Sequence, residues 1–221
     1  MSDSIQLSPT VTLRTLRQGD APALLHAYVR NREHLAPWDP ARLESFFTLE
    51  VQATMLAFQL EELATGVGVP LALWEDDHVV GRVTLARIVR GPLQSASVGY
   101  FIDRDYTGRG LASAALAHTL DQAHRTLGLH RIEASTLLNN VGSQRVLRRA
   151  GFEQIGMAPE YLQIAGEWQD HLLFHKILRE SALPGEVGLR RDVPVSDRTG
   201  RVGVHSSLEP SPHAGPLVDQ D

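Results

Sequence analysis

This chain of 221 residues contains no cysteine and no long hydrophobic run, and only 6% of its residues are aromatic. The lack of cysteine excludes disulfides, thiolate zinc sites and a cysteine nucleophile. No stretch approaches the roughly 20 apolar residues that cross a bilayer, so we expect no membrane span. The first residues, MSDSIQLSPT, contain neither a basic region nor an apolar one, so no export signal is expected and a cytoplasmic location is the default.

Positive charge is also scarce. The chain has 21 Lys and Arg against 26 Asp and Glu, a net charge of −5. A nucleic-acid-binding surface needs a basic face, so nucleic acid is not expected as a partner. The hydrophobic fraction of 43% and the charged fraction of 21% are those of an ordinary globular protein. The length suits one domain with an appendage.

Hydrophobic patterns in the first third of the chain predict a strand and two helices. Apolar and polar residues alternate over residues 11–16, as in a half-buried strand. One amphipathic helix follows a cap at Asp20, and a second runs from about residue 43 to residue 63. The predicted apolar faces of these helices are Leu24, Leu25, Tyr28 and Val29 for the first, and Phe47, Val51, Met55, Phe58 and Leu63 for the second.

The rest of the chain alternates between strand and helix patterns. Three strands in close order predict an antiparallel meander, and β-α units and a final strand pair follow it. The predicted strands are 71–75, 79–89, 95–102, 130–136, 152–156 and 168–178, with helices from 111 to about 127 and over 141–150. This order predicts an α/β (α+β) fold, a single domain with a mixed, mainly antiparallel twisted sheet flanked by helices.

Composition also suggests where the domain begins and ends. Residues 1–9 are predicted to be a short lead and residues 10–180 the domain. Residues 181–221 are rich in Pro, Gly, Ser and charge, which predicts a flexible tail in which residues 187–195 could add a short strand.

The stretch TGRGLA (107–112) joins a strand pattern to a helix pattern and predicts an anion site. The first amides of a helix have no partner within the helix, and the helix dipole favours negative charge there. The Walker phosphate-binding pattern is absent, and the dinucleotide pattern lacks its third glycine because Ser113 stands there. Both nucleotide-binding patterns are therefore excluded.

This loop resembles the pyrophosphate loop of the GCN5-related N-acetyltransferases, whose signature is Gln/Arg-x-x-Gly-x-Gly/Ala. The segment NNVGSQRVLRRAGF (139–152) looks like the second block of that family. The segments NREHLAPW (31–38) and PEYLQIAGEWQDHLLF (159–174) look like its RimJ/RimL-type branch, which acetylates the N-termini of ribosomal proteins. The resemblance covers about residues 10–178.

The resemblance implies acetyl-CoA as cosubstrate and direct transfer of acetyl to an amine. The backbone amides of the glycine loop would hold the pyrophosphate, and the end of the preceding strand would lie beside the pantetheine arm. There the N–H of Phe101 or Ile102 would stabilise the oxyanion, and Asn140 would contact the pantetheine from the other side. The implied coenzyme-binding residues are Tyr100, Phe101, Ile102, Asp103, Gly108, Arg109, Gly110, Leu111, Ala112, Asn140 and Ser143.

Two proton transfers follow from this chemistry. The amine must be neutral to attack, and Glu160 stands at the position that resembles the base of RimL-like enzymes. Many relatives protonate the thiolate with a tyrosine seven residues after the Asn, but that position is Leu147 here, and Ser143 is the best substitute. Thr107 replaces the usual Gln or Arg, so phosphate binding would depend more on amides and on Arg109.

Each of these roles has a structural alternative. The glycines could be ordinary loop residues, and Asn140 and Ser143 could be helix caps. Glu160 could be a solvated loop carboxylate. Glu133 is the alternative base, or it pairs with Arg131 or another arginine. Trp38 lines the acceptor site, as in relatives, or packs between its neighbouring prolines.

The histidines do not favour a metal site. His171 and His175 fall on one face of a predicted strand, about 13 Å apart at roughly 3.3 Å per residue. His118 and His124 fall on different faces of a helix. We therefore expect no catalytic metal.

The predicted function is an acetyl-CoA-dependent N-acetyltransferase that acts on the N-terminal α-amine of a protein. Two alternatives remain open: a small-molecule amine acetyltransferase on the same fold, and a CoA-binding sensor without turnover, which Leu147 and Thr107 keep open. The family branch also suggests a homodimer, for which no residues can be named.

Overall fold

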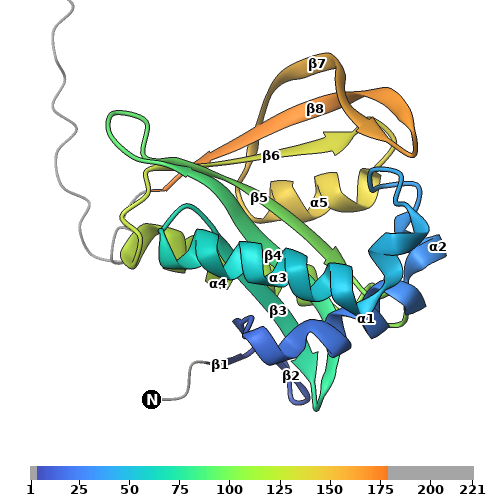
Figure 1. The fold of residues 1–221 in the computed structure, drawn as a ribbon. Helices are drawn as coiled ribbons and strands as arrows, with labels where there is room; N and C mark the ends of the chain where they lie inside the picture. Colours follow the sequence, from blue (N-terminus) through green and yellow to red (C-terminus); the bar gives the residue numbers. More distant parts are fainter. Residues whose placement is uncertain (1–3, 179–221) are drawn as a thin grey trace, which may run out of the picture. The chain divides into compact units, whose positions relative to one another are not determined.

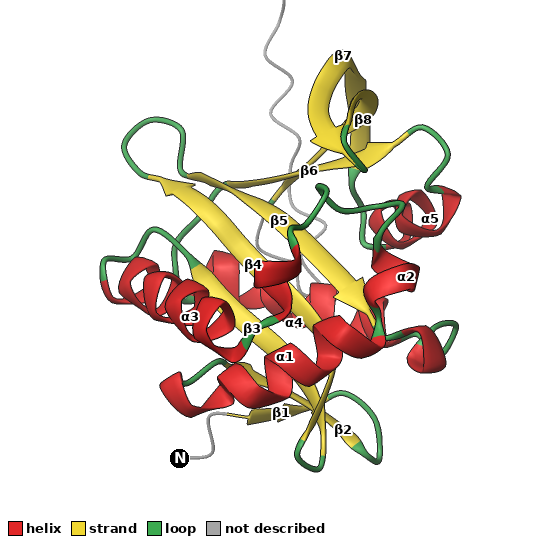
Figure 2. Ribbon diagram, turned by 45° about the vertical axis from the view of Figure 1, so that its right-hand side comes forward, coloured by secondary structure: helices red, strands yellow, loops and turns green. Residues whose placement is uncertain are grey.

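A computed structural model describes residues 4–178, which form one eight-stranded sheet with helices on both faces (Figures 1 and 2). The strand order is β1-β2-β3-β4-β5-β6-β8-β7. This is the mixed sheet with flanking helices that the sequence predicts, so the fold class is confirmed. The predicted tail, 181–221, and the short strand within it lie outside the described residues.

The elements follow the predicted order. The strands are β1 (Ser4–Gln6), β2 (Val11–Thr15), β3 (Val69–Glu75), β4 (His78–Val89), β5 (Ser95–Ile102), β6 (Arg131–Leu137), β7 (Glu153–Ile164) and β8 (Glu167–Ile177). The helices are α1 (Ala21–Arg30), α2 (Arg32–Leu35), α3 (Leu49–Ala64), α4 (Leu111–Arg125) and α5 (Val141–Arg149), with 3₁₀ turns η1 (Gln18–Asp20), η2 (Glu44–Phe47) and η3 (Arg104–Tyr106).

The sheet changes character between β5 and β6. Strands β1 to β5 form an antiparallel meander, and β6, β8 and β7 form a second antiparallel group. The two groups are joined by the parallel pair β5–β6, which pairs only Ser95–Ser97 with Arg131–Glu133. Beyond these residues the two strands diverge (Figure 1). The edge of β5 over residues 98–102 is therefore free of a strand partner among the described residues.

Two hydrophobic cores lie on opposite faces of the sheet. Helices α1 and α3 cover one face, where Leu24, Leu56 and Trp74 are buried together. The other core includes Leu116 of α4 and Leu147 of α5. Strand β5 therefore has two distinct sides, one toward α1 and α3 and one toward α4 and α5.

The predicted apolar face of α1 is partly wrong. The helix buries Ala21, Leu24 and Ala27, whereas Val29 is 53% exposed. Small alanines let the helix approach the sheet closely, so the contact stripe is narrower than the larger residues indicated. Asp20 also makes no side-chain cap to α1. Its carboxylate instead accepts hydrogen bonds from Arg14 and from the Arg17 N–H.

The long amphipathic run predicted over 43–63 is divided in two. Thr48 ends η2 and caps α3, because its side chain accepts a hydrogen bond from the Val51 N–H. Helix α3 then buries Gln52 and Leu56, and Phe58 is 66% exposed, contrary to the prediction. The break at Thr48 shifts the packed face onto residues that a continuous helix would not select.

Two strand boundaries also differ from expectation. Residues 4–6, within the predicted lead, form β1 and pair with β2. Strand β7 continues to Ile164, eight residues beyond its predicted end, because it pairs with β8 on both sides of an irregular segment. The resulting β7–β8 hairpin carries Glu160.

Candidate functional site

The open edge of β5 presents backbone groups for a ligand. The Asp103 N–H donates to the Val80 carbonyl on β4, and the Phe101 carbonyl oxygen lies against Gly81 of β4. Successive residues of a strand direct their backbone groups to opposite edges. Tyr100 and Ile102 therefore direct theirs to the open edge. Of the two predicted oxyanion donors, Ile102 has the suitable direction and Phe101 does not.

The glycine turn before α4 needs glycine at two positions. Gly108 and Gly110 adopt φ angles of +75° and +78°, in the left-handed region that other residues occupy at a cost. Gly110 directly precedes the first residue of α4. Beyond the chain neighbours, no atom lies within 4 Å of a Cβ built at either glycine, so the space over the turn is open. The pyrophosphate role of 108–112, which includes Leu111 and Ala112, stays a prediction.

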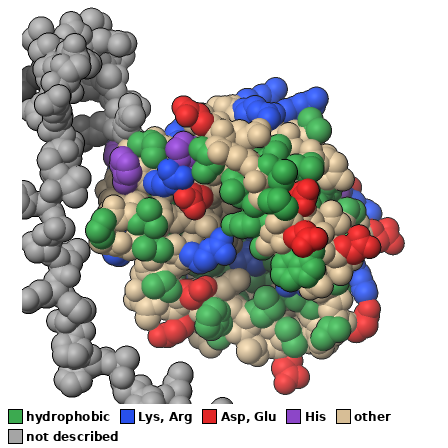
Figure 3. Space-filling view, turned by 90° about the horizontal axis from the view of Figure 1, so that it is seen from above, with side chains coloured by type: hydrophobic (Ala, Val, Ile, Leu, Met, Phe, Trp, Pro, Cys, Tyr) green, Lys and Arg blue, Asp and Glu red, His purple; other side chains and the backbone are tan. Residues whose placement is uncertain are grey.

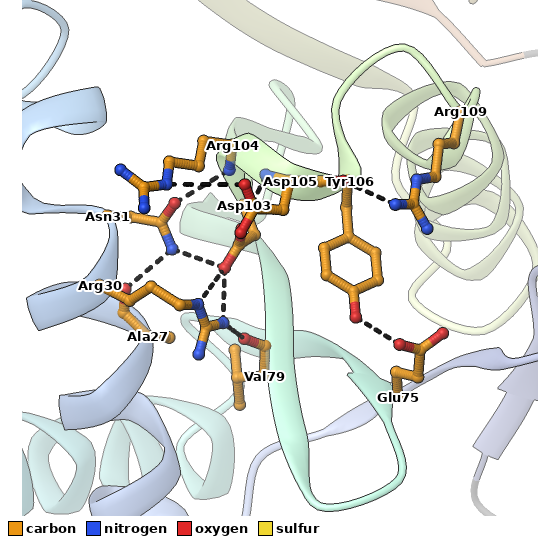
Figure 4. A network of polar contacts seen from close by, with 10 residues as sticks. All are labelled: Ala27, Arg30, Asn31, Glu75, Val79, Asp103, Arg104, Asp105, Tyr106 and Arg109. Atoms are coloured by element: carbon orange, nitrogen blue, oxygen red, sulfur yellow. Dashed lines mark hydrogen bonds and ion pairs between the residues drawn. The ribbon is translucent and has the colours of Figure 1, made fainter.

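Arg109 is held by its own loop (Figure 4). Its Nη2 donates to the Asp105 carbonyl at 2.7 Å, and its guanidinium lies over the Tyr106 ring at 4.5 Å. The Tyr106 hydroxyl in turn donates to Glu75 of β3. The loop is thereby fixed to the β3–β4 hairpin before any ligand binds.

The side chain of Asp103 is engaged by residues of the domain itself. It is 0% exposed and accepts hydrogen bonds from Arg30 at 2.6 Å, Asn31 at 2.8 Å and the Asp105 N–H at 3.0 Å. Burial alone would raise the pKa of Asp103, but the hydrogen bonds from Asn31, the Asp105 amide and Arg30 outweigh it and hold the pKa below its usual value. The carboxylate fastens the loop to the end of α1 and is fully engaged within the domain (Figure 4).

The start of α5 lies against β5. Asn140 caps the helix, because its Oδ1 accepts from the Ser143 N–H at 3.0 Å. The Ser143 Oγ lies 2.9 Å from the Tyr100 hydroxyl, which also lies 3.2 Å from the Ser143 carbonyl oxygen. Burial raises the pKa of Tyr100 to about 12, partly offset by the Ser143 hydrogen bond, so this phenol stays neutral at physiological pH. The two predicted walls of the pantetheine channel thus meet through one pair of hydroxyls.

Leu147 of α5 is fully buried in the hydrophobic core. The position at which many relatives have the tyrosine that protonates the thiolate is therefore a core position here. Tyr100 is instead the phenol that contacts Ser143. The sequence placed Tyr100 beside the coenzyme but did not reveal this contact. The available signal was its alternation with Ala96 and Val98, which lie in the core on the α4 and α5 side.

Glu160 lies in a wide bulge of β7. The β7–β8 register passes from Ala158 opposite His171 to Leu162 opposite Gln169, so three residues of β7 face Asp170 alone. Glu160 adopts φ +45°, and its N–H donates to the Asp170 carboxylate at 2.9 Å. A left-handed residue other than glycine costs about 1–2 kcal/mol. The bulge exposes the Glu160 side chain, and no residue within 4–178 forms an ion pair with its carboxylate.

The segment that carries Trp38 adjoins this hairpin. The Asp39 carbonyl accepts from the Ala165 N–H at 3.0 Å, which ties the loop after α2 to the β7–β8 turn. Trp38 itself is partly exposed. The predicted acceptor residue and the predicted base are therefore carried by neighbouring segments.

Glu133 forms an ion pair with Arg131, which was the structural alternative to its role as base. Its carboxylate accepts from Arg131 Nε at 2.7 Å. It lies opposite Ser97 of β5, where the two strands are still paired, and not along the open edge. Its alternative role as base has less support than that of Glu160.

Within residues 4–178, no group of three or more His, Asp or Glu side chains is arranged to hold a metal ion. His171 and His175 both lie in β8, and His118 and His124 lie in α4. In the same part of the chain, no helix combines the length and apolar character needed to cross a membrane.

The sequence did not lead us to predict that Arg82 is a buried charged residue. Arg82 lies in the middle of β4 and is only 7% exposed. Its guanidinium donates to the Tyr28 hydroxyl at 2.7 Å and to Gln59 Oε1 at 2.9 Å. The available signal was a single charged residue within the otherwise uncharged run VVGRVTLA (79–86).

One face of the domain has a hollow in its surface. Figure 3 views the domain from above the orientation of Figure 1 and shows hydrophobic side chains gathered around a hollow, with Lys or Arg atoms beside and within it.

Comparison with known proteins agrees with this geometry. Residues 10–153 match the family model described as "Acetyltransferase (GNAT) domain". "Probable N-acetyltransferase YjcK" of Bacillus subtilis (strain 168) is 35% identical over 164 residues, which cover 73% of this chain and 91% of that protein. "[Ribosomal protein uS5]-alanine N-acetyltransferase" of Escherichia coli (strain K12) is 33% identical over 165 residues, which cover 74% of this chain and 85% of that protein.

A solved structure gives the same result. Mycobacterium smegmatis RimJ in complex with CoA-disulfide superposes with a TM-score of 0.72 at 33% identity, over 76% of this chain and 81% of that one. Sequence and fold thus agree over the residues in which the resemblance to N-acetyltransferases was found.

Proposed function

Because this chain belongs to the GNAT acetyltransferase family, we propose that it transfers acetyl from acetyl-CoA to the N-terminal α-amine of a protein, with ribosomal proteins as the substrate class. The E. coli relative, named for the alanine of ribosomal protein uS5, supports this acceptor. The observation that carries the proposal is the free edge of β5, between the glycine turn before α4 and the capped start of α5.

The coenzyme occupies this gap. Its pyrophosphate binds the amides of Gly108–Ala112, where unpaired N–H groups and the helix dipole favour an anion. Its pantetheine arm follows the open edge of β5 and pairs with the outward backbone groups of Tyr100 and Ile102, as an added strand does. Asn140 and Ser143 flank it from α5. Mycobacterium smegmatis RimJ, which has the same fold and was solved in complex with CoA-disulfide, supports coenzyme A as the ligand.

The reaction needs three contributions from the protein. Glu160 accepts a proton from the acceptor ammonium, directly or through water, and the neutral amine attacks the thioester carbonyl. The Ile102 N–H stabilises the oxyanion of the tetrahedral intermediate. On collapse the C–S bond breaks, the amide nitrogen loses its remaining extra proton to water, and the thiolate, hydrogen-bonded to the Ser143 hydroxyl, takes a proton from water.

Tyr100 assists Ser143. The phenol stays protonated and donates to the Ser143 carbonyl oxygen at 3.2 Å, and its oxygen lies 2.9 Å from Ser143 Oγ, so it holds the serine beside β5. A neutral phenol with a pKa of about 12 is a poor proton source for a thiolate, so its role here is orientation.

The strained backbone at Glu160 supports its role as base. Left-handed residues other than glycine persist only where surrounding contacts hold them, and they gather at functional sites. The Asp170 hydrogen bond supplies such a contact. It holds Glu160 in the exposed bulge, where a base can meet an amine from solution.

Release of the coenzyme A thiol tests this proposal. Peptides that begin with Ala, Ser or Met, and small amines such as polyamines and arylalkylamines, serve as acceptors. The proteins are the wild type, Glu160→Gln and Glu167→Gln, which alters an exposed glutamate of the same hairpin. We expect Glu160→Gln to lower kcat by about 10²- to 10⁴-fold with unchanged coenzyme affinity, and Glu167→Gln to match the wild type. Turnover that survives in Glu160→Gln would move the base elsewhere. Turnover only on small amines, or none despite coenzyme binding, would replace the proposed acceptor by the small-amine or sensor alternative.

The location and extent of the catalytic unit complete this proposal. A ribosomal-protein substrate favours the cytoplasm. We propose residues 10–180 as the catalytic domain, since the family match begins at residue 10 and β8 ends at Ile177.

A further inference from the structure

Arg82 is a buried charge whose hydrogen-bonding capacity is largely unused. A guanidinium has five N–H donors. Here Nη1 donates to the Tyr28 hydroxyl and Nη2 donates to Gln59, while Nε is buried with no partner. Both partners are neutral. Three N–H donors, including the Nε–H, are therefore free among the described residues.

No carboxylate of residues 4–178 pairs with this charge. The other arginines that contact α1 or its flanks do find one, since Arg14 binds Asp20 and Arg30 binds Asp103. Removing a charge from water without a counter-ion is costly, and buried charges in proteins are normally paired. Within residues 4–178, Arg82 is therefore a buried positive charge without a counter-ion.

The position of Arg82 identifies the side from which that anion comes. Arg82 is paired with Phe101 of β5, one strand from the open edge. Its side chain is directed to α1 and α3, through Tyr28 and Gln59. Tyr28 also contacts Phe101 and Phe46, at ring-centroid distances of 5.5 and 5.0 Å. The proposed coenzyme site lies on the α4 and α5 side, so an anion at Arg82 belongs to the acceptor.

We propose that Arg82 binds a carboxylate of the acceptor, an inference that rests on the function proposed above. The two remaining Nη–H donors, one on each terminal nitrogen of the guanidinium, match the two oxygens of a carboxylate in a bidentate pair. Tyr28, Phe46 and Phe101 form an apolar wall next to that pair. The acceptor thus has an acidic group close to its amine, which is either an Asp or Glu side chain shortly after a protein N-terminus or the α-carboxylate of a free amino acid.

The two sources of the carboxylate are separated by matched acceptors. Peptides that begin with Ala carry Glu or Gln at position 2, 3 or 4, and free alanine is compared with alaninamide. Both series are assayed for turnover and, with coenzyme A present, for equilibrium binding by calorimetry, so that binding is recorded even without catalysis. The proteins are the wild type, Arg82→Met, Arg82→Lys and Arg87→Met, which removes an exposed arginine from the same strand.

We expect the wild type to favour one carboxylate acceptor over its neutral counterpart by at least about tenfold in KM or Kd. Arg82→Met abolishes that preference by weakening only the acidic acceptor, Arg82→Lys retains part of it, and Arg87→Met retains all of it. A preference in the peptide series assigns the carboxylate to a side chain, and a preference for alanine over alaninamide assigns it to an amino acid.

Two results would overturn the inference. One is equal use and binding of acidic and neutral acceptors by the wild type in both series. The other is a preference that persists in Arg82→Met. Failure of the proposed function looks different, because peptide turnover is then absent while the alanine series or the binding measurement still reports on Arg82.

Discussion

Two arginines beside the end of β5 have opposite surroundings. Arg30 of α1 binds the buried Asp103 carboxylate, and Asn31 joins the same carboxylate to the Arg104 N–H (Figure 4). Within residues 4–178, the Arg82 guanidinium of β4 donates to the hydroxyl of Tyr28 and the amide oxygen of Gln59, and to no carboxylate. The first charge is neutralised within the domain and fixes the segment 103–105 to the end of α1. The second charge has no carboxylate partner among residues 4–178, and its hydrogen-bond acceptors are neutral.

The largest expected effect comes from breaking the neutralised site. Asp103→Asn removes the charge that pairs with Arg30, and breaking a buried pair costs about 3–5 kcal/mol. Because Arg30 is 31% exposed on its side chain and can regain water, we expect the lower end of that range. Urea unfolding at pH 7 measures it. Asp105→Asn, which alters an exposed neighbouring carboxylate, should change the free energy of unfolding by less than about 0.5 kcal/mol.

Acid should remove the difference between wild type and Asp103→Asn. The pKa of Asp103 is lowered in the folded protein, so its contribution is present above the pKa of an unfolded Asp and is lost as pH falls through the folded value. The two unfolding free energies should converge in that range. A constant gap down to low pH would contradict the assigned role.

An intermediate effect is expected at Tyr100, which is half-buried and uncharged. Its pKa is raised to about 12, whereas the phenol of an unfolded chain ionises near 10. Its contribution is complete below pH 10 and is lost as pH rises toward 12, a loss of about 2–3 kcal/mol by linkage. Urea unfolding at pH 8 and pH 11 should show about half of this loss in the wild type, because pH 11 lies midway between the two pKa values, and a smaller loss in Tyr100→Phe. Tyr161→Phe, which alters an exposed tyrosine, should follow the wild type.

The smallest effect is expected at Arg82. Replacing a buried charge without a carboxylate partner by an apolar side chain of similar length is often neutral or stabilising. Arg82→Met loses two hydrogen bonds to neutral groups and also removes the cost of burying the charge. We expect its free energy of unfolding to stay within about 1 kcal/mol of the wild type, measured in urea. A loss as large as that of Asp103→Asn would show that the two sites do not differ as described.

The sequence predicted what depends on local pattern. The order of strands and helices, the glycine turn at 108–110 and the Asn140 cap are visible because turns, caps and alternation have local signatures. The predictions of the packed faces of α1 and α3 were partly wrong. These faces depend on the small alanines of α1 and on the break at Thr48, and a pattern based on hydrophobicity alone includes neither feature.

The charge pattern of the site was not predictable by the same means. Whether Asp103 binds a ligand or Arg30 depends on residues 73 positions apart. The Tyr100–Ser143 contact and the neutral partners of Arg82 likewise join distant elements. The bulge at Glu160 requires the register of β7 against β8, which one strand does not reveal.

The short β5–β6 pairing has a mechanical consequence. Three residue pairs join the two strand groups, and along the rest of β5 no described strand continues the hydrogen-bonded ladder. At the other side of the gap, the Asp39–Ala165 hydrogen bond connects the first group's helical segment to the second group's hairpin. A pantetheine arm that pairs with β5 in this gap extends the ladder that the polypeptide leaves incomplete. In the proposed placement the substrate adds to β5 as a ninth strand, and its departure as coenzyme A returns the sheet to its open form.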